Sequence, residues 1–369
     1  MQRTELRALT SLRGLAAMAV VLQHFSATAA GLSSSWIPSL VPHGYMAVDF
    51  FFVLSGFIMA YNYLPGFEAN GMQEFRPFLF KRIARIFPLG IAVTVLILAC
   101  AGIASLWGRA DLFIPANVLQ GDLTFATLVN LAHLQGFLPR FSFNGPSWSV
   151  SLELGTYLLF PALLQLYVGP ERRTAALATA ASVATLVLLQ CYAPKSINER
   201  PIAWDIARCI AEFGLGLMVY RAYRGSPRLC AIGADRWTIA ITALTILSSV
   251  LRLDLVTALC FPALVLAYAT NRGRPGRLLS TRVLHDLGTI SFSVYLLHNL
   301  LRTPAAAVLT YLHPEKLPPA QALLFAFLAS LPVLPLATLA YHLVEKPGRT
   351  ALNRLIRLLS QPSFPVGAD

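Results

Sequence analysis

The 369-residue sequence has few charged residues, and this lack excludes most classes of soluble protein. Only 12% of the residues are Asp, Glu, Lys or Arg, whereas a soluble domain carries about 25%. Apolar side chains make up 56% of the chain, and the mean hydropathy is +0.62. The composition therefore predicts an integral membrane protein before any motif is considered.

Acidic residues and paired cysteines are also scarce. There are 17 acidic against 29 basic residues, a formal net charge of +12. In a membrane chain such an excess is typical of basic cytoplasmic loops, so no nucleic-acid partner is expected. None of the five cysteines forms a CxxC pair, so we expect buried, inert thiols with no disulfide framework and no metal site. The first apolar stretch is too long for a cleaved signal peptide and is interpreted as a retained span.

Ten apolar segments are long enough to cross a bilayer, which needs roughly 20 mostly apolar residues. A weaker stretch, 123–138, contains Asn130, His133 and Gln135 and is interpreted as a re-entrant or interfacial segment. The fold class predicted is an all-α bundle of ten transmembrane helices. The predicted spans are 9–30, 47–64, 86–107, 149–168, 174–191, 205–222, 236–252, 255–271, 287–312 and 321–343.

The basic residues indicate the orientation of these spans. With both termini inside, 21 of the 29 Lys and Arg residues fall on the cytoplasmic side, in 3–13, 76–85, 172–173, 221–236, 272–282 and 346–357. A further span at 123–138 would invert every later loop and place these clusters outside. We therefore predict an N-in, C-in, multi-pass protein of a bacterial inner membrane. Residues 1–350 are expected to form one transmembrane domain, followed by a short cytoplasmic tail, 351–369.

The first predicted span contains two ionisable residues, Arg13 and His24, on one helix face and about 16 Å apart along the axis. Ionisable residues within spans are candidates for function. For His24 the alternative is a packing or hydrogen-bonding role, and for Arg13 a snorkelling end residue. Asp49 opens the second span at the depth of His24. Its carboxylate would orient the imidazole and raise its basicity, and a helix N-cap is the alternative.

Two arginines precede the third span. Arg82 and Arg85 are three residues apart and so are neighbours on one helix face, on the predicted cytoplasmic side. Guanidinium forks match phosphate oxygens, so the pair suits a nucleotide-like ligand. The alternative is that these arginines only set the topology.

The fourth span begins with Trp148-Ser-Val-Ser-Leu-Glu153, in which Ser149 and Glu153 share a helix face. A carboxylate buried at the depth of His24 needs a partner. Two further histidines, His298 in the ninth span and His342 at the end of the tenth, are interpreted as structural.

Together these segments resemble the acyltransferase type 3 family of membrane proteins. The resemblance covers about residues 7–350. It rests on six motifs in order: Arg13 with His24, FFVLSGF at 51–57, R-x-x-R at 82–85, W-S-x-S-x-E at 148–153, S-x-S-x-Y-L-x-H at 291–298, and E-K-P at 345–347. The resemblance implies O-acylation of carbohydrates, often acetylation, from cytoplasmic acyl-coenzyme A. It also implies a catalytic histidine and a donor contact by R-x-x-R.

The chain is similar to exopolysaccharide O-acetyltransferases in a stand-alone form, without an extracytoplasmic esterase-like domain. It departs from the family pattern after Glu153, because Leu154 and Gly155 follow where a second carboxylate or Trp/Gln often stands. Glu153 is therefore the only carboxylate there.

The hypothesis from sequence is an acyl-coenzyme A-dependent O-acyltransferase of the lipid bilayer, with acetyl-coenzyme A as co-substrate, a carbohydrate as acceptor, and no metal or bound cofactor. The pantetheine arm of the coenzyme would bridge the distance between Arg13 and His24. Two alternatives remain at this stage: a lipid or small secondary metabolite such as a macrolide as acceptor, and a saccharide transporter. The roles assigned are catalytic for His24, Asp49 and Glu153, donor-binding for Arg13, Arg82 and Arg85, and acceptor-binding for Trp148 and Ser149.

Overall fold

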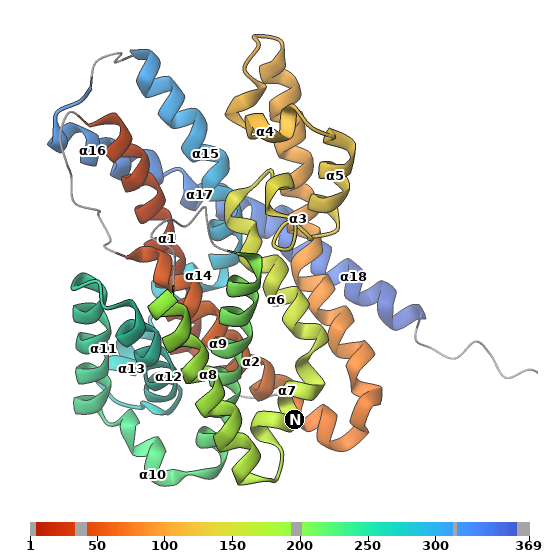
Figure 1. Cartoon of the computed structure of the whole chain (residues 1–369), viewed down its shortest axis with the longest axis vertical. Helices are drawn as coiled ribbons and strands as arrows, with labels where there is room; N and C mark the ends of the chain where they lie inside the picture. The colour runs from red at the N-terminus through yellow and green to blue at the C-terminus, as the bar shows by residue number, and fades with distance from the viewer. Residues whose placement is uncertain (1–4, 34–42, 193–200, 313–315, 360–369) are drawn as a thin grey trace, which may run out of the picture.

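The structure is a computed structural model that describes residues 5–33, 43–192, 201–312 and 316–359 (Figure 1). Within these ranges every regular element is a helix, and the only β-type pairing is an isolated bridge between Ser33 and Leu317. The α-helices are α1 (Arg7–Leu32), α2 (Ala47–Asn70), α3 (Phe75–Ser105), α4 (Ala116–Leu119), α5 (Leu123–Leu131), α6 (Trp148–Leu158), α7 (Phe160–Val168), α8 (Arg172–Tyr192), α9 (Ile202–Gly225), α10 (Pro227–Cys230), α11 (Asp235–Val250), α12 (Asp254–Thr270), α13 (Arg274–Leu279), α14 (Arg282–Thr289), α15 (Ser291–Leu312), α16 (Pro319–Ser330), α17 (Val333–Ala340) and α18 (Lys346–Leu359).

All ten segments predicted as spans are largely helical where they are described, so the all-α class is confirmed. By length and composition, four helical stretches can cross a membrane: Arg7–Gly31, Gly44–Ser105, Arg172–Tyr192 and Pro319–Ile356. The number rises to six if each of two bent helix pairs is one span. The ten-span count and the N-in orientation remain predictions. Residues 360–369 of the predicted tail lie outside the described residues.

Three predicted spans are broken rather than continuous, and two of the breaks lie at prolines; in the third, 287–312, α14 ends at Thr289 and α15 begins at Ser291. Residues 149–168 form α6 and α7, bent by 71° with Pro161 in the first turn of α7. Residues 321–343 form α16 and α17, with Pro332 between them, and then a π-helix at Tyr341–Glu345. Proline has no backbone N–H to donate and clashes with the preceding turn, so a helix ends before it or begins at it.

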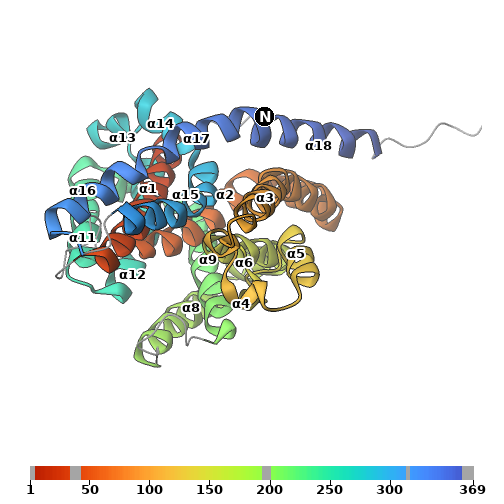
Figure 2. The same ribbon diagram turned by 90° about the horizontal axis from the view of Figure 1, so that it is seen from above.

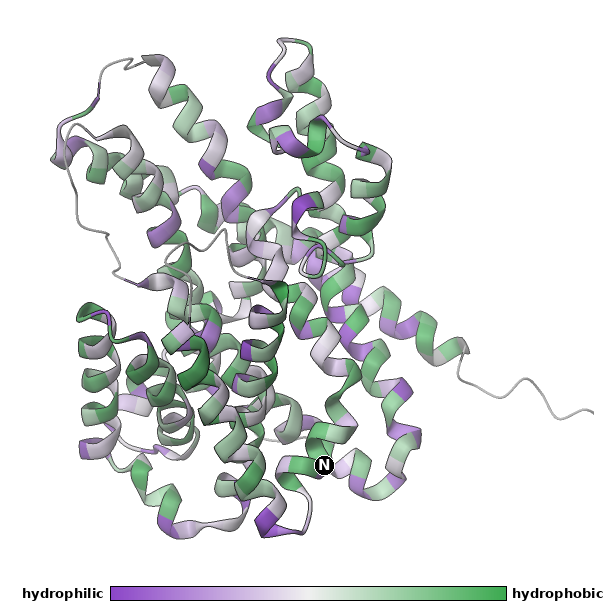
Figure 3. Cartoon of the chain, in the orientation of Figure 1, coloured by the Kyte–Doolittle hydropathy of each residue, from purple (hydrophilic) through white to green (hydrophobic). Residues whose placement is uncertain are grey.

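Apolar residues run along most of the helices, as the hydropathy colouring in Figure 3 shows. Large apolar side chains such as Ile103, Leu177 and Ile239 are more than half exposed. Many large exposed apolar side chains mark contact with a partner or a membrane. Together with the apolar helices, they identify a membrane protein.

The closest packing in the bundle joins α2 to α9. A β-carbon on Gly56 would overlap the carbonyl oxygen of Phe213, and one on Gly216 would overlap the carbonyl oxygen of Val53. Small residues let helix backbones approach in this way within membranes. Phe57 and Phe213 are fully buried beside this contact. The pair α2–α9 therefore forms a rigid centre.

The segment 123–138 is not a continuous span. It contains α5, nine residues long, and then turns at His133, whose φ is +55°. Nine helical residues extend only about 14 Å, less than a bilayer needs. The segment packs on α3, because the His133 imidazole occupies the space beside Gly90 where a β-carbon would be.

The last helix, α18, leaves the body of the protein and extends past α3, as the view from above in Figure 2 shows. Where it crosses α3, Gly348 lies against the ring of Pro88. The π-helix before α18 carries Glu345 into the interior, where it is 1% exposed. The chain end thus contributes directly to the centre of the bundle.

Candidate active site

A cavity of about 170 Å³ lies among α1, α2, α3, α6 and α15, and five of the eight predicted site residues line it. We call it the arginine cavity. Its charged lining is three arginines and one glutamate, an excess of two positive charges. The charged and polar lining residues are Arg13, Arg82, Arg85, Glu153, Ser55, Ser149, Ser291, Tyr157 and Tyr295.

Arg13 is held where α14 ends and α15 begins. Its Nε donates to Ser291 Oγ at 2.9 Å, and one terminal nitrogen donates to the Gly288 carbonyl oxygen at 2.7 Å. Helix α1 can approach α14 this closely because Gly14 lies against the backbone of Gly288. Arg13 is therefore an interior residue and not a snorkelling end residue.

The two R-x-x-R arginines have different partners. Arg85 forms an ion pair with the buried Glu345, which also accepts from Ser293 Oγ at 2.6 Å, and its guanidinium lies 5.2 Å from the Phe292 ring centroid. Arg82 donates to the Tyr63 hydroxyl at 2.6 Å, and its buried Nε has no partner among the described residues. Only Arg82 thus keeps a buried, unused donor for a ligand.

Glu153 is part of the arginine cavity and not a neighbour of His24. Its Oε1 accepts a hydrogen bond from Ser55 Oγ and a second from the Tyr157 hydroxyl at 2.6 Å. Ser55 lies in the FFVLSGF motif, so two motifs that are far apart in sequence meet here. Glu153 is half-buried, and two hydroxyl groups supply the hydrogen-bond partners that its carboxylate needs.

His24 is paired with a second imidazole. Its Nδ1 lies 2.8 Å from His298 Nε2, and the two rings are nearly parallel. His298 is completely buried, and its Nδ1 lies 2.6 Å from the Tyr295 carbonyl oxygen. A carbonyl oxygen only accepts, so His298 Nδ1 carries the hydrogen.

This contact determines the tautomer of His24. With no carboxylate beside it, the buried His298 ring is neutral, because an unpaired buried charge is costly. Its Nε2 is then an acceptor, and His24 Nδ1 must donate to it. Nε2 of a neutral His24 is consequently the nitrogen with a free lone pair. A free imidazole lone pair can act as a general base or a nucleophile.

The predicted contact between Asp49 and His24 is wrong. Asp49 is 3% exposed and forms a two-pronged ion pair with Arg208 of α9, in which Nε donates at 2.6 Å. Arg208 also lies 3.7 Å from the buried Glu212. The reason is direction: Asp49 faces the α2–α9 contact, whereas the partner of His24 lies on α15. Nor is Asp49 an N-cap, since no side-chain cap bond begins α2.

Of the two residues predicted to bind the acceptor, one lines the arginine cavity and the other does not. Ser149 lines the arginine cavity and donates to the Tyr295 hydroxyl at 2.8 Å, because that hydroxyl itself donates to the Pro146 carbonyl oxygen. Trp148 packs edge-on against Phe52 and does not line the cavity. Tyr295 connects the two parts of the site, since its hydroxyl holds Ser149 and its carbonyl holds His298.

Sequence reasoning missed three of these residues as parts of the site: His298, Tyr295 and Glu345. All three lie in the motifs quoted above, in S-x-S-x-Y-L-x-H and E-K-P. Their position in these motifs is the signal that could have identified them as site residues. Their partners are 52 to 274 residues away along the chain, so only the fold identifies the contacts.

Comparisons with known proteins identify the family of the chain. The family model of acyltransferase type 3, described as an acyltransferase domain, matches residues 6–342. "Acyltransferase MdmB" of Streptomyces mycarofaciens is 32% identical over 53% of this chain and 49% of that protein. "Putative peptidoglycan O-acetyltransferase YrhL" of Bacillus subtilis is 26% identical over 93% of this chain and 54% of that protein.

A third relative, "Putative O-acetyltransferase SACOL0978" of Staphylococcus aureus, is 26% identical over 42% of this chain and 24% of its own length. The chain spans about half the length of these curated relatives, or less. No solved structure matches. The family match covers most of the chain and decides against a transporter, and so the chain belongs to the acyltransferase type 3 family of membrane acyltransferases.

Proposed function

We propose that this protein transfers an acetyl group from cytoplasmic acetyl-coenzyme A to a hydroxyl of a carbohydrate, such as an exopolysaccharide or a lipid-linked oligosaccharide, in a bacterial inner membrane. The observation that carries the proposal is the His24–His298 contact, which leaves His24 Nε2 unprotonated one helical turn beyond the arginine cavity. Tyr295 of α15 lines the cavity, and His298 follows it one helical turn later on the same helix.

The donor would enter at the arginine cavity. Its lining has two more positive than negative charges, which favours an anionic ligand. Arg82 is the primary phosphate contact in this proposal, because its Nε is buried and unpaired. Arg85 has a different task, since Glu345 already neutralises it. It holds the wall of the cavity formed by α3 and α15.

The size of the cavity supports a particular placement of the donor. Sites that enclose a drug-sized ligand measure about 300–1,000 Å³, and this cavity is about 170 Å³. It fits a phosphate and the adjoining part of the pantetheine arm, with the rest of the nucleotide outside and the acylated end beyond the cavity at His24. The arm is an extended chain that can follow α1 from Arg13 towards His24, about 16 Å.

In the reaction, His24 Nε2 accepts the proton of the acceptor hydroxyl as the oxygen attacks the thioester carbonyl carbon. A carbon–oxygen bond forms and the carbon–sulfur bond breaks. The thiolate leaves and takes the proton from His24, so that ester and free coenzyme A are the products. His298 accepts the Nδ1 hydrogen bond throughout and keeps the imidazole in the reactive orientation. Ser149 and Glu153 orient the acceptor.

The first test is His24→Ala, with His342→Ala as a matched control. His342 is exposed and outside the site. Loss of a general base lowers rates by about 10²–10⁴-fold, so His24→Ala should abolish coenzyme A release and glycan acetylation, whereas His342→Ala should retain both. Near-normal transfer by correctly inserted His24→Ala protein would remove the centre of the proposal.

The second test concerns the donor. Arg82→Ala should raise the concentration of acetyl-coenzyme A needed for half-maximal rate, and Arg82→Lys should recover it only in part, because lysine offers a point charge and not a fork. The acceptor dependence should not change. If Arg82→Ala protein keeps the wild-type donor dependence, the phosphate site lies elsewhere, and the 272–282 loop is the next candidate.

Mass spectrometry of surface glycans from a strain that lacks the gene tests the acceptor. Loss of O-acetyl groups from a glycan supports the carbohydrate acceptor. Unchanged glycans, with coenzyme A release still dependent on His24, would instead identify a lipid or a small metabolite as the acceptor.

A further inference from the structure

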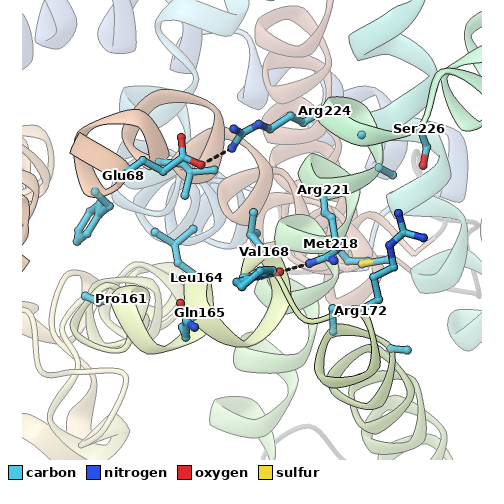
Figure 4. Close-up of a pocket in the computed structure, with 18 of the residues that line it drawn as sticks. Glu68, Pro161, Leu164, Gln165, Val168, Arg172, Met218, Arg221, Arg224 and Ser226 are labelled. Carbon is cyan, nitrogen blue, oxygen red and sulfur yellow. Dashed lines mark hydrogen bonds and ion pairs between the residues drawn. The ribbon is translucent and has the colours of Figure 1, made fainter. Parts of the chain in front are cut away.

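A second cavity, larger than the first, lies at the other end of α2 and α9. It measures about 980 Å³ and is bounded by the ends of α2 and α9, the helix α7, and the beginning of α8. Figure 4 shows it between the Glu68–Arg224 ion pair and the segment Pro161–Val168 of α7. Its volume is at the upper end of the range for small-molecule sites.

The polar part of this cavity is basic. Arg172, Arg221 and Arg224 line it against one acidic residue, Glu68, an excess of two positive charges. Glu68 pairs with Arg224 at 2.5 Å, and Arg221 donates to the carbonyl oxygens of Tyr167 and Gly169 at the end of α7. Arg172 has no hydrogen-bonding or ionic partner among the described residues. Its guanidinium is therefore available to an anion.

The rest of the lining is apolar, and it reaches the outer surface. Leu164, Val168 and Met218 form the apolar wall. Met72 and Leu229 also line the cavity and are 64% and 52% exposed. The cavity thus offers exposed arginines together with an exposed apolar border. This combination suits an amphiphile, whose head group and hydrocarbon chains need different surroundings. A soluble anion such as inorganic phosphate would gain nothing from this border.

A block of aromatic rings separates this cavity from the arginine cavity. Phe67, which lines the second cavity, contacts Phe160 at 5.6 Å between ring centroids. Phe160 stacks on Phe78 at 4.5 Å, and Phe78 contacts Tyr157, which lines the arginine cavity, at 5.8 Å. Phe78 and Phe160 are completely buried. A ligand in the second cavity thus has no route to the reacting groups, which argues against the acyl donor as its occupant.

We infer that the second cavity binds an anionic phospholipid of the cytoplasmic leaflet. Arg172 and Arg221 hold the phosphate of the head group, and the acyl chains leave over Met72 and Leu229. Under the predicted orientation this end of the bundle faces the cytoplasm, where anionic lipids meet basic pockets between helices. The site is separate from acyl transfer, so the inference does not depend on the proposed donor or acceptor.

The test uses the purified full-length protein, with phosphatidylglycerol and phosphatidylcholine of matched chains as probes and native mass spectrometry to count retained lipid. Arg172→Ala should weaken phosphatidylglycerol retention about fivefold, equivalent to ~1 kcal/mol for one arginine at an anionic lipid. Arg172→Glu, which replaces attraction by repulsion, should weaken it about thirtyfold, equivalent to ~2 kcal/mol. The neighbour Arg173 does not line the cavity, so Arg173→Glu is the matched control and should bind as the wild type does.

Thermal unfolding in lipid-free detergent verifies that all three variants are folded. Selective retention of phosphatidylglycerol that is lost in Arg172→Glu and kept in Arg173→Glu supports the site. Equal retention of both lipids, or equal loss in Arg172→Glu and Arg173→Glu, would overturn it. Displacement of the lipid by millimolar inorganic phosphate alone would also overturn it, because the occupant would then be a soluble anion.

Discussion

Replacement of His298 is the most direct test of how His24 is prepared for catalysis. His298→Ala removes the acceptor of the His24 Nδ1 hydrogen bond, which now measures 2.8 Å. A buried donor left without its partner costs about 1–3 kcal/mol, and the freed imidazole can adopt the other tautomer. We therefore expect the acyl-transfer rate to fall about 5- to 150-fold. This is less than the loss expected for His24→Ala, about 10²–10⁴-fold.

The variant His298→Gln distinguishes whether His298 orients the His24 imidazole or only fills space beside it. A glutamine amide oxygen can lie near the position of an imidazole Nε2 and accept the same hydrogen bond. The order of rates should be wild type, then His298→Gln, then His298→Ala, then His24→Ala. His298 does not line the arginine cavity, so the donor concentration for half-maximal rate should not change. Coenzyme A release from purified protein measures both quantities.

A double variant completes the test. If His298 acts only through His24, then adding His298→Ala to His24→Ala should lower the rate no further, because residues that act as one unit are not additive. Two results would refute the reasoning. One is a His298→Ala rate within twofold of the wild type, and the other is a double variant whose losses multiply.

Three further predictions concern orientation and stability. Reporter fusions after residues 40, 230, 277 and 355 should place only the first outside, and an outside signal at 230 would reverse the predicted topology. Arg85→Ala should destabilise the protein by about 3–5 kcal/mol, because Glu345 remains buried without its partner, and denaturant unfolding in detergent should show partial recovery when Glu345→Gln is added. Gly56→Leu should lower the unfolding temperature strongly, because the leucine side chain would overlap the Phe213 backbone. Gly31→Leu is the control and should not lower it, because there is open space around Gly31. Similar unfolding temperatures for the two variants would contradict the close packing of α2 on α9.

Hydropathy and charge were sufficient to find the helices, because each predicted span needs only a long apolar run. They did not find the bend at Leu159, since a proline ends a helix or merely kinks it according to what packs beside it. The place of a polar residue along a helix was also readable from the sequence, whereas its depth in the membrane stays a prediction. Its direction around the helix was not readable, and Asp49 illustrates the difference, since it faces Arg208 and not His24.

Arg82 and Arg85 illustrate what residue spacing predicts and what it does not. The spacing of Arg82 and Arg85 predicts that they share a face, and both do line one cavity with Arg13. Nothing local, however, indicates that Arg85 is already neutralised by Glu345, 260 residues later. Nothing in the sequence around His298 indicates its contact with His24 either, because that contact depends on how α1 packs against α15.

The distance along the chain between these partners has a consequence for biosynthesis. His24 and His298 are 274 residues apart, and bacterial ribosomes add about 5–20 residues per second, so roughly 14 to 55 s pass between their synthesis. During that time α1 is present in the membrane with Arg13 and His24 unpaired, and the arginine cavity has no α15 wall. The proposed acyl-transfer site is therefore completed only after α15 and Glu345 have been synthesised. A chain that stops before α15 lacks the His24–His298 pair, and the Arg85–Glu345 ion pair forms only after residue 345 has been synthesised.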